Sequence, residues 1–237
     1  MKTQRASAFQ CLLSRLEDLA GITLDRDLVR QALAHRSYVN ENPGNLPGSN
    51  ERLEFLGDAV LGLLVTHQLY LTVPHGDEGE LSRRKALLVS EASLAGYAVE
   101  LGVDQAILVG WGERASGGSK KRSLLADAME AIIGALYLAG GPEPARGLIL
   151  HYMSLEEKSL EGRLLADAKT RLQEMLQAAQ RGPASYRVVA EEGPDHAKTF
   201  RVEVWLEGKP LGQGTGRSKK EAEQEAASSA LRRLDAP

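Results

Sequence analysis

Two short clusters of acidic residues, far apart in the sequence, contain the side chains best suited to chemistry. Within each cluster the acids are three or four residues apart, which places them on one face of a helix. The five residues are Glu51, Glu54, Asp58, Asp127 and Glu130. Both segments are also rich in apolar residues, so we expect these helices to face a core, where unpaired carboxylates are costly.

A divalent cation resolves this conflict if the two helices pack together. Two bare carboxylates about 6 Å apart repel by about 3 kcal/mol at an effective dielectric constant of about 20. Mg²⁺ and Mn²⁺ prefer oxygen ligands, whereas zinc prefers His and Cys, which do not accompany the acids. The pattern therefore predicts a magnesium or manganese site, and such sites can activate water for hydrolysis.

Simpler interpretations remain open for some of these acids. Glu51 alone is equally compatible with a solvated helix face, and Asp127 with a residue favoured by the dipole at a helix N-terminus. Apolar neighbours leave little solvent-facing surface for Glu54 and Asp58. Glu78, in a separate Asp-Glu-Gly segment, fits an ordinary loop carboxylate. His35 is interpreted as a hydrogen-bonded structural group of an apolar helix rather than as a general base.

The first part of the chain, residues 1–158, has helical periodicity throughout. Ser49 or Asn50 is suited to cap the helix that carries the first acidic cluster. A further helix is expected from about 81 to 100. The second acidic cluster opens an apolar helix that ends at the Gly-Gly-Pro of residues 140–142.

The C-terminal part has a different pattern. We place a polar linker at 159–166 and a second domain at 167–236. That domain should contain, in order, a helix, three strands and a helix, at 167–179, 186–190, 199–206, 211–216 and 219–234. The fold class is therefore an all-α N-terminal domain followed by an α+β domain with α-β-β-β-α order.

Composition indicates a soluble protein with no membrane association. The chain has 237 residues, a net charge of −3 and a single cysteine, which fits a reducing cytoplasm. No secretory signal is recognisable, and the longest apolar stretches, 59–65 and 131–139, are shorter than the ~20 residues that span a bilayer. Residues 166–237 carry 12 basic and 11 acidic residues, so this half is less acidic than the other.

The sequence resembles bacterial ribonuclease III, the endonuclease of double-stranded RNA. The resemblance covers essentially the whole chain and rests on four segments in the family's order: 34–38 (AHRSY), 50–58 (NERLEFLGD), 77–79 (DEG) and 125–130 (LADAME). It implies a homodimeric enzyme that uses Mg²⁺, with Mn²⁺ as a substitute. It also implies 5′-phosphate and 3′-hydroxyl products, and ribosomal and messenger RNA precursors as substrates.

The same resemblance assigns roles to individual residues. Metal binding falls to Glu54, Asp58, Asp127 and Glu130, of which Asp58 and Glu130 are the first candidates for catalysis. Glu51 and Glu78 would be supporting acids along the RNA-binding valley. Phe55 would insert into the partner subunit, although from the sequence alone an ordinary core phenylalanine is equally compatible.

Residues 167–236 resemble a double-stranded-RNA-binding domain. Ser218 and Glu221 form a capping box that opens the last helix. Lys219 and Lys220 follow in its first turn, where the helix dipole disfavours cations unless a phosphate is bound there. The resemblance implies that the following residues contact RNA: Thr170, Gln173, Glu174, Pro194, His196, Ser218, Lys219 and Lys220. Such domains recognise duplex shape more than sequence.

Two alternatives from other classes are a noncatalytic RNA-binding protein that retains the nuclease fold, and a metal-dependent hydrolase of small nucleotides. Intact acids at positions 54, 58, 127 and 130 argue against the first. The appended RNA-binding domain argues against the second. Cleavage of duplex RNA with and without Mg²⁺ distinguishes all three.

Overall fold

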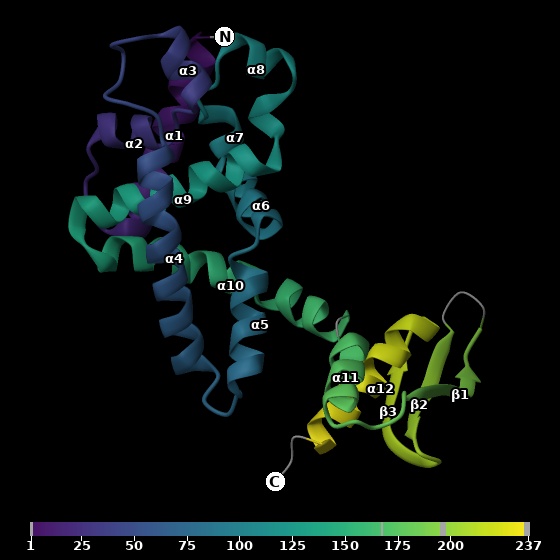
Figure 1. Cartoon of the computed structure of the whole chain (residues 1–237). Coiled ribbons are helices and arrows are strands. Elements are labelled where there is room, and N and C mark those ends of the chain that lie inside the picture. Colours follow the sequence, from purple (N-terminus) through teal and green to yellow (C-terminus); the bar gives the residue numbers. More distant parts are fainter. Residues whose placement is uncertain (1, 167, 195–197, 235–237) are drawn as a thin grey trace. The chain divides into compact units, whose positions relative to one another are not determined.

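The structure is a computed structural model that describes residues 2–166, 168–194 and 198–234 (Figure 1). The chain divides into two compact units, Met1–Glu157 and Lys158–Pro237. The first is helical, and the second contains a three-stranded sheet that is preceded and followed in the chain by a helix. These architectures confirm the predicted fold class.

The first unit is built from helices connected by short loops. Their bounds are α1 Lys2–Ala20, α2 Arg26–Ala32, α3 Arg36–Glu41, α4 Glu51–Thr72, α5 Glu78–Leu88, α6 Glu91–Leu101, α7 Val103–Ala106, α8 Trp111–Ala115, α9 Arg122–Gly140 and α10 Pro142–Ala166, with a 3₁₀ turn at Gly118–Lys120. Helix α9 is the centre of the core, where it packs against α4, α6, α2 and α7. Its apolar residues from Ala131 to Leu136 are all buried.

Helices α4 and α9 cross with their backbones in close contact, and two glycines make this possible. A side-chain carbon at Gly57 would overlap the backbone carbonyl oxygen of Glu130. A side-chain carbon at Gly134 would overlap the backbone carbonyl oxygen of Leu53. The crossing therefore fixes the N-terminal half of α4 against the middle of α9, which is where the acidic clusters lie.

The helix ends show which local predictions were right. Asn50 is the residue before α4, as expected, but its side chain makes no capping hydrogen bond. The single helix expected over 81–100 is wrong, because α5 ends at Leu88 and α6 begins at Glu91. The Ser90 side chain accepts a hydrogen bond from the backbone N–H of Ser93, and this cap starts the second helix.

The second unit confirms the predicted order of elements. Its bounds are α11 Ala168–Ala178, β1 Ser185–Glu192, β2 Thr199–Leu206, β3 Lys209–Gly216 and α12 Lys219–Leu234. The strands form one antiparallel sheet in the order β1-β2-β3. Val202, Val204 and Leu206 on β2 are buried in a core with Leu172 of α11 and Leu231 of α12. This core belongs to the second unit alone.

The expected linker is helical in the structure. Helix α10 continues to Ala166, so the segment 159–166, which was expected to be a linker, lies within a helix.

By length and hydropathy alone, α4 and α9 could each cross a bilayer. Residues of α9 are mostly buried against neighbouring helices, which is the position of a core helix in a globular unit.

The close backbone contact at Gly57 predicts how far one added methyl group would lower the stability of the protein. Gly57→Ala should lower the free energy of unfolding by about 3 kcal/mol, because neither backbone can move away without opening the core. Gly96→Ala is the matched control, since a side-chain carbon there meets no atom within 4 Å. That variant should be neutral or stabilised by about 0.5–1 kcal/mol, because alanine favours a helix over glycine. Urea unfolding of both variants measures the difference, and equal stabilities would contradict the close crossing.

Candidate active site

The crossing of α4 and α9 brings the two acidic clusters onto facing helices. Glu54 and Asp58 lie one turn apart on α4, and Asp127 and Glu130 lie on α9. Gly57, the neighbour of Asp58, is the residue in close contact with the backbone of Glu130. This contact joins the two clusters, although they are far apart in the sequence.

The pKa shifts show that these carboxylates interact. Burial raises the pKa of Glu130 to about 7, with further increases from the charges of Asp58, Glu54 and Asp127. Burial also raises the pKa of Glu54, followed by the charges of Asp127, Glu51 and Asp58. Each helix therefore raises the pKa of a carboxylate on the other, as expected when like charges converge in a region of reduced solvation.

Asp127 has a raised pKa too, and its neighbours include a residue that the sequence did not identify. Burial is the largest cause and the charge of Glu91 adds to it, whereas His35 and a hydrogen bond from the Asp127 backbone N–H act in the opposite direction. Glu91 is the first residue of α6. In the sequence, a glutamate after Ser90 looks like an acidic residue favoured by the helix dipole, so no local signal marked it.

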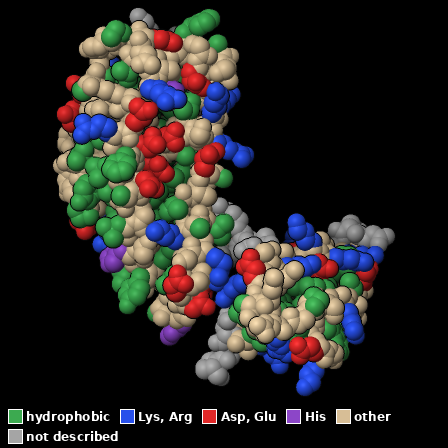
Figure 2. All heavy atoms as spheres, in the orientation of Figure 1, with side chains coloured by type: hydrophobic (Ala, Val, Ile, Leu, Met, Phe, Trp, Pro, Cys, Tyr) green, Lys and Arg blue, Asp and Glu red, His purple; other side chains and the backbone are tan. Residues whose placement is uncertain are grey.

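The four acids lie at an open face and not within the core. Asp58 is exposed, whereas Glu54, Asp127 and Glu130 are partly buried. Figure 2 shows acidic side chains gathered over and beside the N-terminal half of α4. The expectation that Glu54 and Asp58 have little solvent-facing surface is therefore wrong for Asp58. Apolar residues on both sides of it belong to two different faces of α4, one buried and one exposed.

The chemistry of the four carboxylates suits a hard divalent cation. In the described part of the chain, the side chains of Glu54, Asp58 and Glu130 have no hydrogen bond or ion pair with another residue. Within the same ranges, no three His, Cys, Asp or Glu side chains already stand as a compact metal-binding group. The four carboxylates thus lie on one face, but their side chains are not already arranged at metal-binding distances from one another. Oxygen-only donors fit Mg²⁺ or Mn²⁺.

Glu51 and Glu78, the two expected supporting acids, have different positions. Glu51 begins α4, accepts a hydrogen bond from Ser49 Oγ at 2.8 Å and lies 3.8 Å from Arg36. Its charge contributes to the raised pKa of Glu54, so it borders the cluster. Glu78 begins α5 and accepts a hydrogen bond from Ser82 Oγ at 2.9 Å. It does not contribute to the pKa shifts of Glu54, Asp127 or Glu130, and the structure does not bring it to the cluster within one chain.

His35 is the residue before α3, where its side chain accepts a hydrogen bond from the backbone N–H of Ser37. Its Nδ1 also lies 2.8 Å from Ser37 Oγ. His35 sits between α2 and α3 rather than within a helix, so that part of the expectation is wrong. Its capping contacts agree with a structural role.

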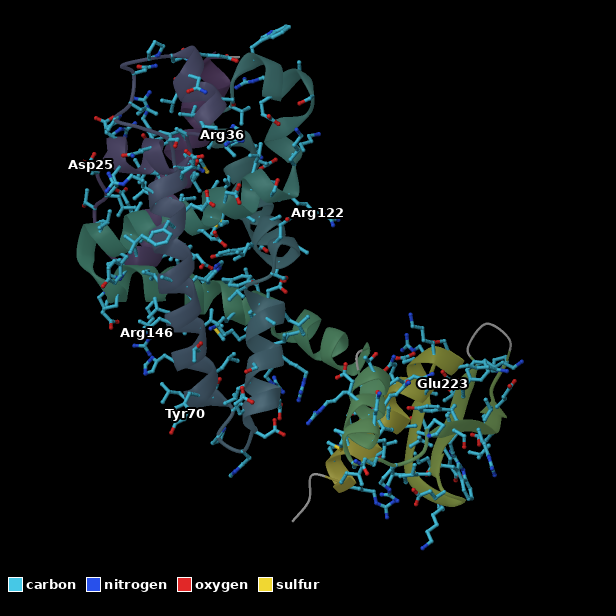
Figure 3. All side chains as sticks on the ribbon, viewed as in Figure 1. Asp25, Arg36, Tyr70, Arg122, Arg146 and Glu223 are labelled. Atoms are coloured by element: carbon cyan, nitrogen blue, oxygen red, sulfur yellow. The ribbon has the colours of Figure 1, made fainter. Side chains whose placement is uncertain are left out.

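Phe55 is not a core residue, because its side chain is 83% exposed. Leu63 and Tyr70, also largely exposed, lie further along α4 at spacings that place all three on one side of the helix. Figure 3 labels Tyr70 near the C-terminal end of α4. We call Phe55, Leu63 and Tyr70 the α4 apolar stripe. The alternative that Phe55 is an ordinary core phenylalanine is therefore wrong.

In the second unit, several residues expected to contact RNA lie on the surface of α11. Thr170, Gln173 and Glu174 are exposed. Thr170 and Gln173 also line a groove of about 380 Å³ together with Lys169, Pro183, Ala184, Tyr186 and Gln224. Pro194 is exposed after β1. His196 lies outside the described residues.

The start of α12 has the predicted capping box. Ser218 Oγ accepts a hydrogen bond from the backbone N–H of Glu221 at 3.1 Å, and Glu221 accepts one from the backbone N–H of Arg217 at 2.8 Å. Lys219 lies 3.0 Å from Glu191 and over the ring of Phe200. These contacts give Lys219 partners within the unit. Lys220 is exposed, and no ion pair joins it to another described residue.

Comparisons with known proteins match both units. The family described as Ribonuclease-III-like matches residues 25–156, and the double-stranded RNA binding motif matches residues 168–234. Among curated proteins, Ribonuclease 3 of Pelotomaculum thermopropionicum is 48% identical over 94% of this chain and 93% of its own length. Ribonuclease 3 of Thermobifida fusca is 47% identical over 93% of this chain and 91% of its own length.

A solved structure is also similar to the first unit. The nuclease domain of ribonuclease III from Campylobacter jejuni is 39% identical, with a TM-score of 0.54. The match covers 60% of this chain and 96% of that domain. In that protein, structural flexibility is described for a region involved in dimer formation.

The raised pKa of Glu130 predicts how stability depends on pH and Mg²⁺. Because the folded protein holds this proton up to about pH 7, whereas an ordinary glutamate has a pKa of 4.5, stability without metal should fall as pH rises through this window. Mg²⁺ competes with the proton, so 10 mM Mg²⁺ should raise Tm by about 2–6 °C at pH 8 and by less at pH 5.5. Calorimetry of wild type and Glu130→Gln tests this. A metal effect that is independent of pH would contradict the assignment.

Proposed function

The chain belongs to the ribonuclease III family and is an endoribonuclease of double-stranded RNA, and from this premise we propose that Glu54, Asp58, Asp127 and Glu130 form its metal-binding active site. The observation that carries the proposal is their convergence from α4 and α9 on one open face. Asp58 and Glu130, on either side of the glycine crossing, are the catalytic pair.

Each part of the chemistry can be assigned to these residues. Glu54, Asp58, Asp127 and Glu130 would hold the divalent metal, which would supply activation of the attacking water and stabilisation of the leaving oxygen. The role of the carboxylates is to bind and orient, and the rigid crossing at Gly57 and Gly134 holds their backbones in place. Hydrolysis leaves 5′-phosphate and 3′-hydroxyl ends.

Mg²⁺ is the proposed cofactor, with Mn²⁺ as a substitute. All four donors are carboxylates, and both ions prefer oxygen ligands. None of these four donors is a histidine or a cysteine, which are the ligands that zinc prefers. Glu51 and Glu78 are proposed as supporting acids, Glu51 at the edge of the cluster and Glu78 at the start of α5.

The second unit binds double-stranded RNA, and we propose that it does so through α11, Pro194, His196 and the start of α12. Thr170, Gln173 and Glu174 present polar groups from one helix, and Ser218, Lys219 and Lys220 do so at the N-terminus of another. Domains of this type contact two minor grooves and the phosphates between them. The substrates proposed for the chain are structured precursors of ribosomal and messenger RNA in the cytoplasm.

The α4 apolar stripe is the proposed homodimer interface. Phe55 is 83%, Leu63 66% and Tyr70 72% exposed, which is unusual for large apolar side chains on one helix. A two-fold axis would place the same stripe on both subunits, so that each Phe55 is buried by the partner. The ribonuclease III of Campylobacter jejuni, which is similar to the first unit, has a region involved in dimer formation.

Replacement of Glu130 tests the active site. Glu130→Gln keeps the shape of the side chain but removes its charge, so cleavage of a duplex RNA in Mg²⁺ should fall by at least about 10²–10³-fold. Binding of the same RNA, measured by fluorescence anisotropy without metal, should stay within about twofold of wild type. Glu143→Gln, at an exposed position of α10, is the matched control and should cleave normally. Wild-type cleavage by Glu130→Gln would refute the assignment.

Variants of the α4 apolar stripe test the dimer. Phe55→Ala and Leu63→Asp should each weaken self-association by about 30-fold or more, because one removes buried aromatic area and the other buries a charge. Trp111→Ala is the control, since Trp111 is 80% exposed but lies on α8. Sedimentation velocity over a concentration series gives the dissociation constants. The interface is wrong if the α4 variants dimerise like wild type.

A further inference from the structure

Three consecutive basic residues on α5 differ in what they contact. Arg83 lies 4.0 Å from Asp77, and Arg84 pairs with Glu80 at 2.8 Å. Both acids lie on or next to the first turn of the same helix. The side chain of Lys85 has no hydrogen bond or ion pair with any residue that the structure describes. It is the one basic residue of the three whose charge is not neutralised locally.

Lys85 instead extends across to α4, where a glycine leaves space for it. Its Nζ and Cε lie 3.7 and 3.8 Å from the position that a side-chain carbon of Gly62 would occupy. The side chain is partly buried between the two helices. A flexible lysine stem that packs on an apolar surface and presents its charged end to solvent is a common arrangement.

The position of Gly62 relates Lys85 to the active site. Gly62 follows Asp58 by four residues, so both lie on the same side of α4, about 6 Å apart along the helix axis. The ammonium group of Lys85 therefore lies beside α4 about one helical turn beyond Asp58. It does not contribute to the pKa shifts of Glu54 or Glu130, so it does not act as their counter-ion.

We propose that Lys85 is an RNA-binding residue of the active-site face, where its ammonium group contacts a phosphate close to the one that is hydrolysed. The four carboxylates repel a polyanion, and a cation without a protein partner beside them compensates part of that repulsion. A phosphate group supplies the anion that Lys85 lacks. This inference rests on the proposed function of the acidic cluster.

The alternative is that Lys85 only fills the space beside Gly62 with its aliphatic stem. The two roles differ in what a change of charge does. Lys85→Gln removes the charge and Lys85→Arg keeps it, while both retain a long side chain. Arg84→Gln is the matched control, because Arg84 is the neighbouring residue and is already paired with Glu80.

The experiment measures binding of a duplex RNA of about 30 base pairs to the full-length protein, without metal, over a range of KCl concentrations. Lys85→Gln should lower the slope of log K against log salt concentration by about one for each Lys85 that contacts a phosphate. Lys85→Arg and Arg84→Gln should keep the wild-type slope. In Mg²⁺, single-turnover cleavage by Lys85→Gln should fall about tenfold, and Lys85→Arg should recover most of the rate.

A wild-type salt slope for Lys85→Gln would overturn the proposal, even if cleavage were lower. An equal loss of RNA binding and cleavage in Lys85→Gln and Lys85→Arg would also overturn the proposal. Such a result would mean that the shape of the lysine side chain matters and that its charge does not. Thermal unfolding of each variant confirms that the fold is retained. The binding arm uses no metal, so it remains interpretable if Glu130→Gln were to show that the proposed catalytic site is wrong.

Discussion

The backbone contact between α4 and α9 is the constraint on which the rest of the first unit depends. Gly57 meets the carbonyl of Glu130, and Gly134 meets the carbonyl of Leu53, so each helix contributes one glycine to the contact. Two helices at this distance have no room for side chains between them. Their acidic residues therefore emerge beside the contact, on the same open face. The small residue at position 57 and the carboxylate at position 58 are two parts of one arrangement.

This arrangement has an electrostatic cost that the core must offset. Burial and mutual repulsion both raise the pKa values of Glu54 and Glu130, which means that the folded protein disfavours their charged forms. Buried Leu, Ile and Ala side chains of α9 supply the hydrophobic stabilisation that holds the acids together. The same repulsion favours a divalent cation, so the features that destabilise the acidic cluster without metal are those that support the proposed metal site.

Local sequence signals predicted much of this organisation, but not the contacts made across the fold. Spacing placed Glu54 and Asp58 on one helix face, and the Ser218 capping box marked the start of α12. The split between α5 and α6 was missed because the cap at Ser90 interrupts an otherwise continuous apolar pattern. The exposure of Phe55 depends on which side of α4 meets α9, and periodicity alone does not decide between two apolar faces.

Glu91, Gly62 and Lys85 illustrate a second limit. Each is an ordinary residue for its helix, and its functional interest comes only from packing. Packing brings the charge of Glu91 close enough to raise the pKa of Asp127, and it brings Lys85 to the open side of α4 at Gly62. The same reasoning applies to Lys219, whose place in a helix first turn looked unfavourable until Glu191 was found 3.0 Å away. A phosphate at this helix N-terminus must compete with that carboxylate for the ammonium group. If RNA binds there as proposed, Lys219 exchanges one ion pair for another, and this exchange gains less binding free energy than an unpaired lysine would give.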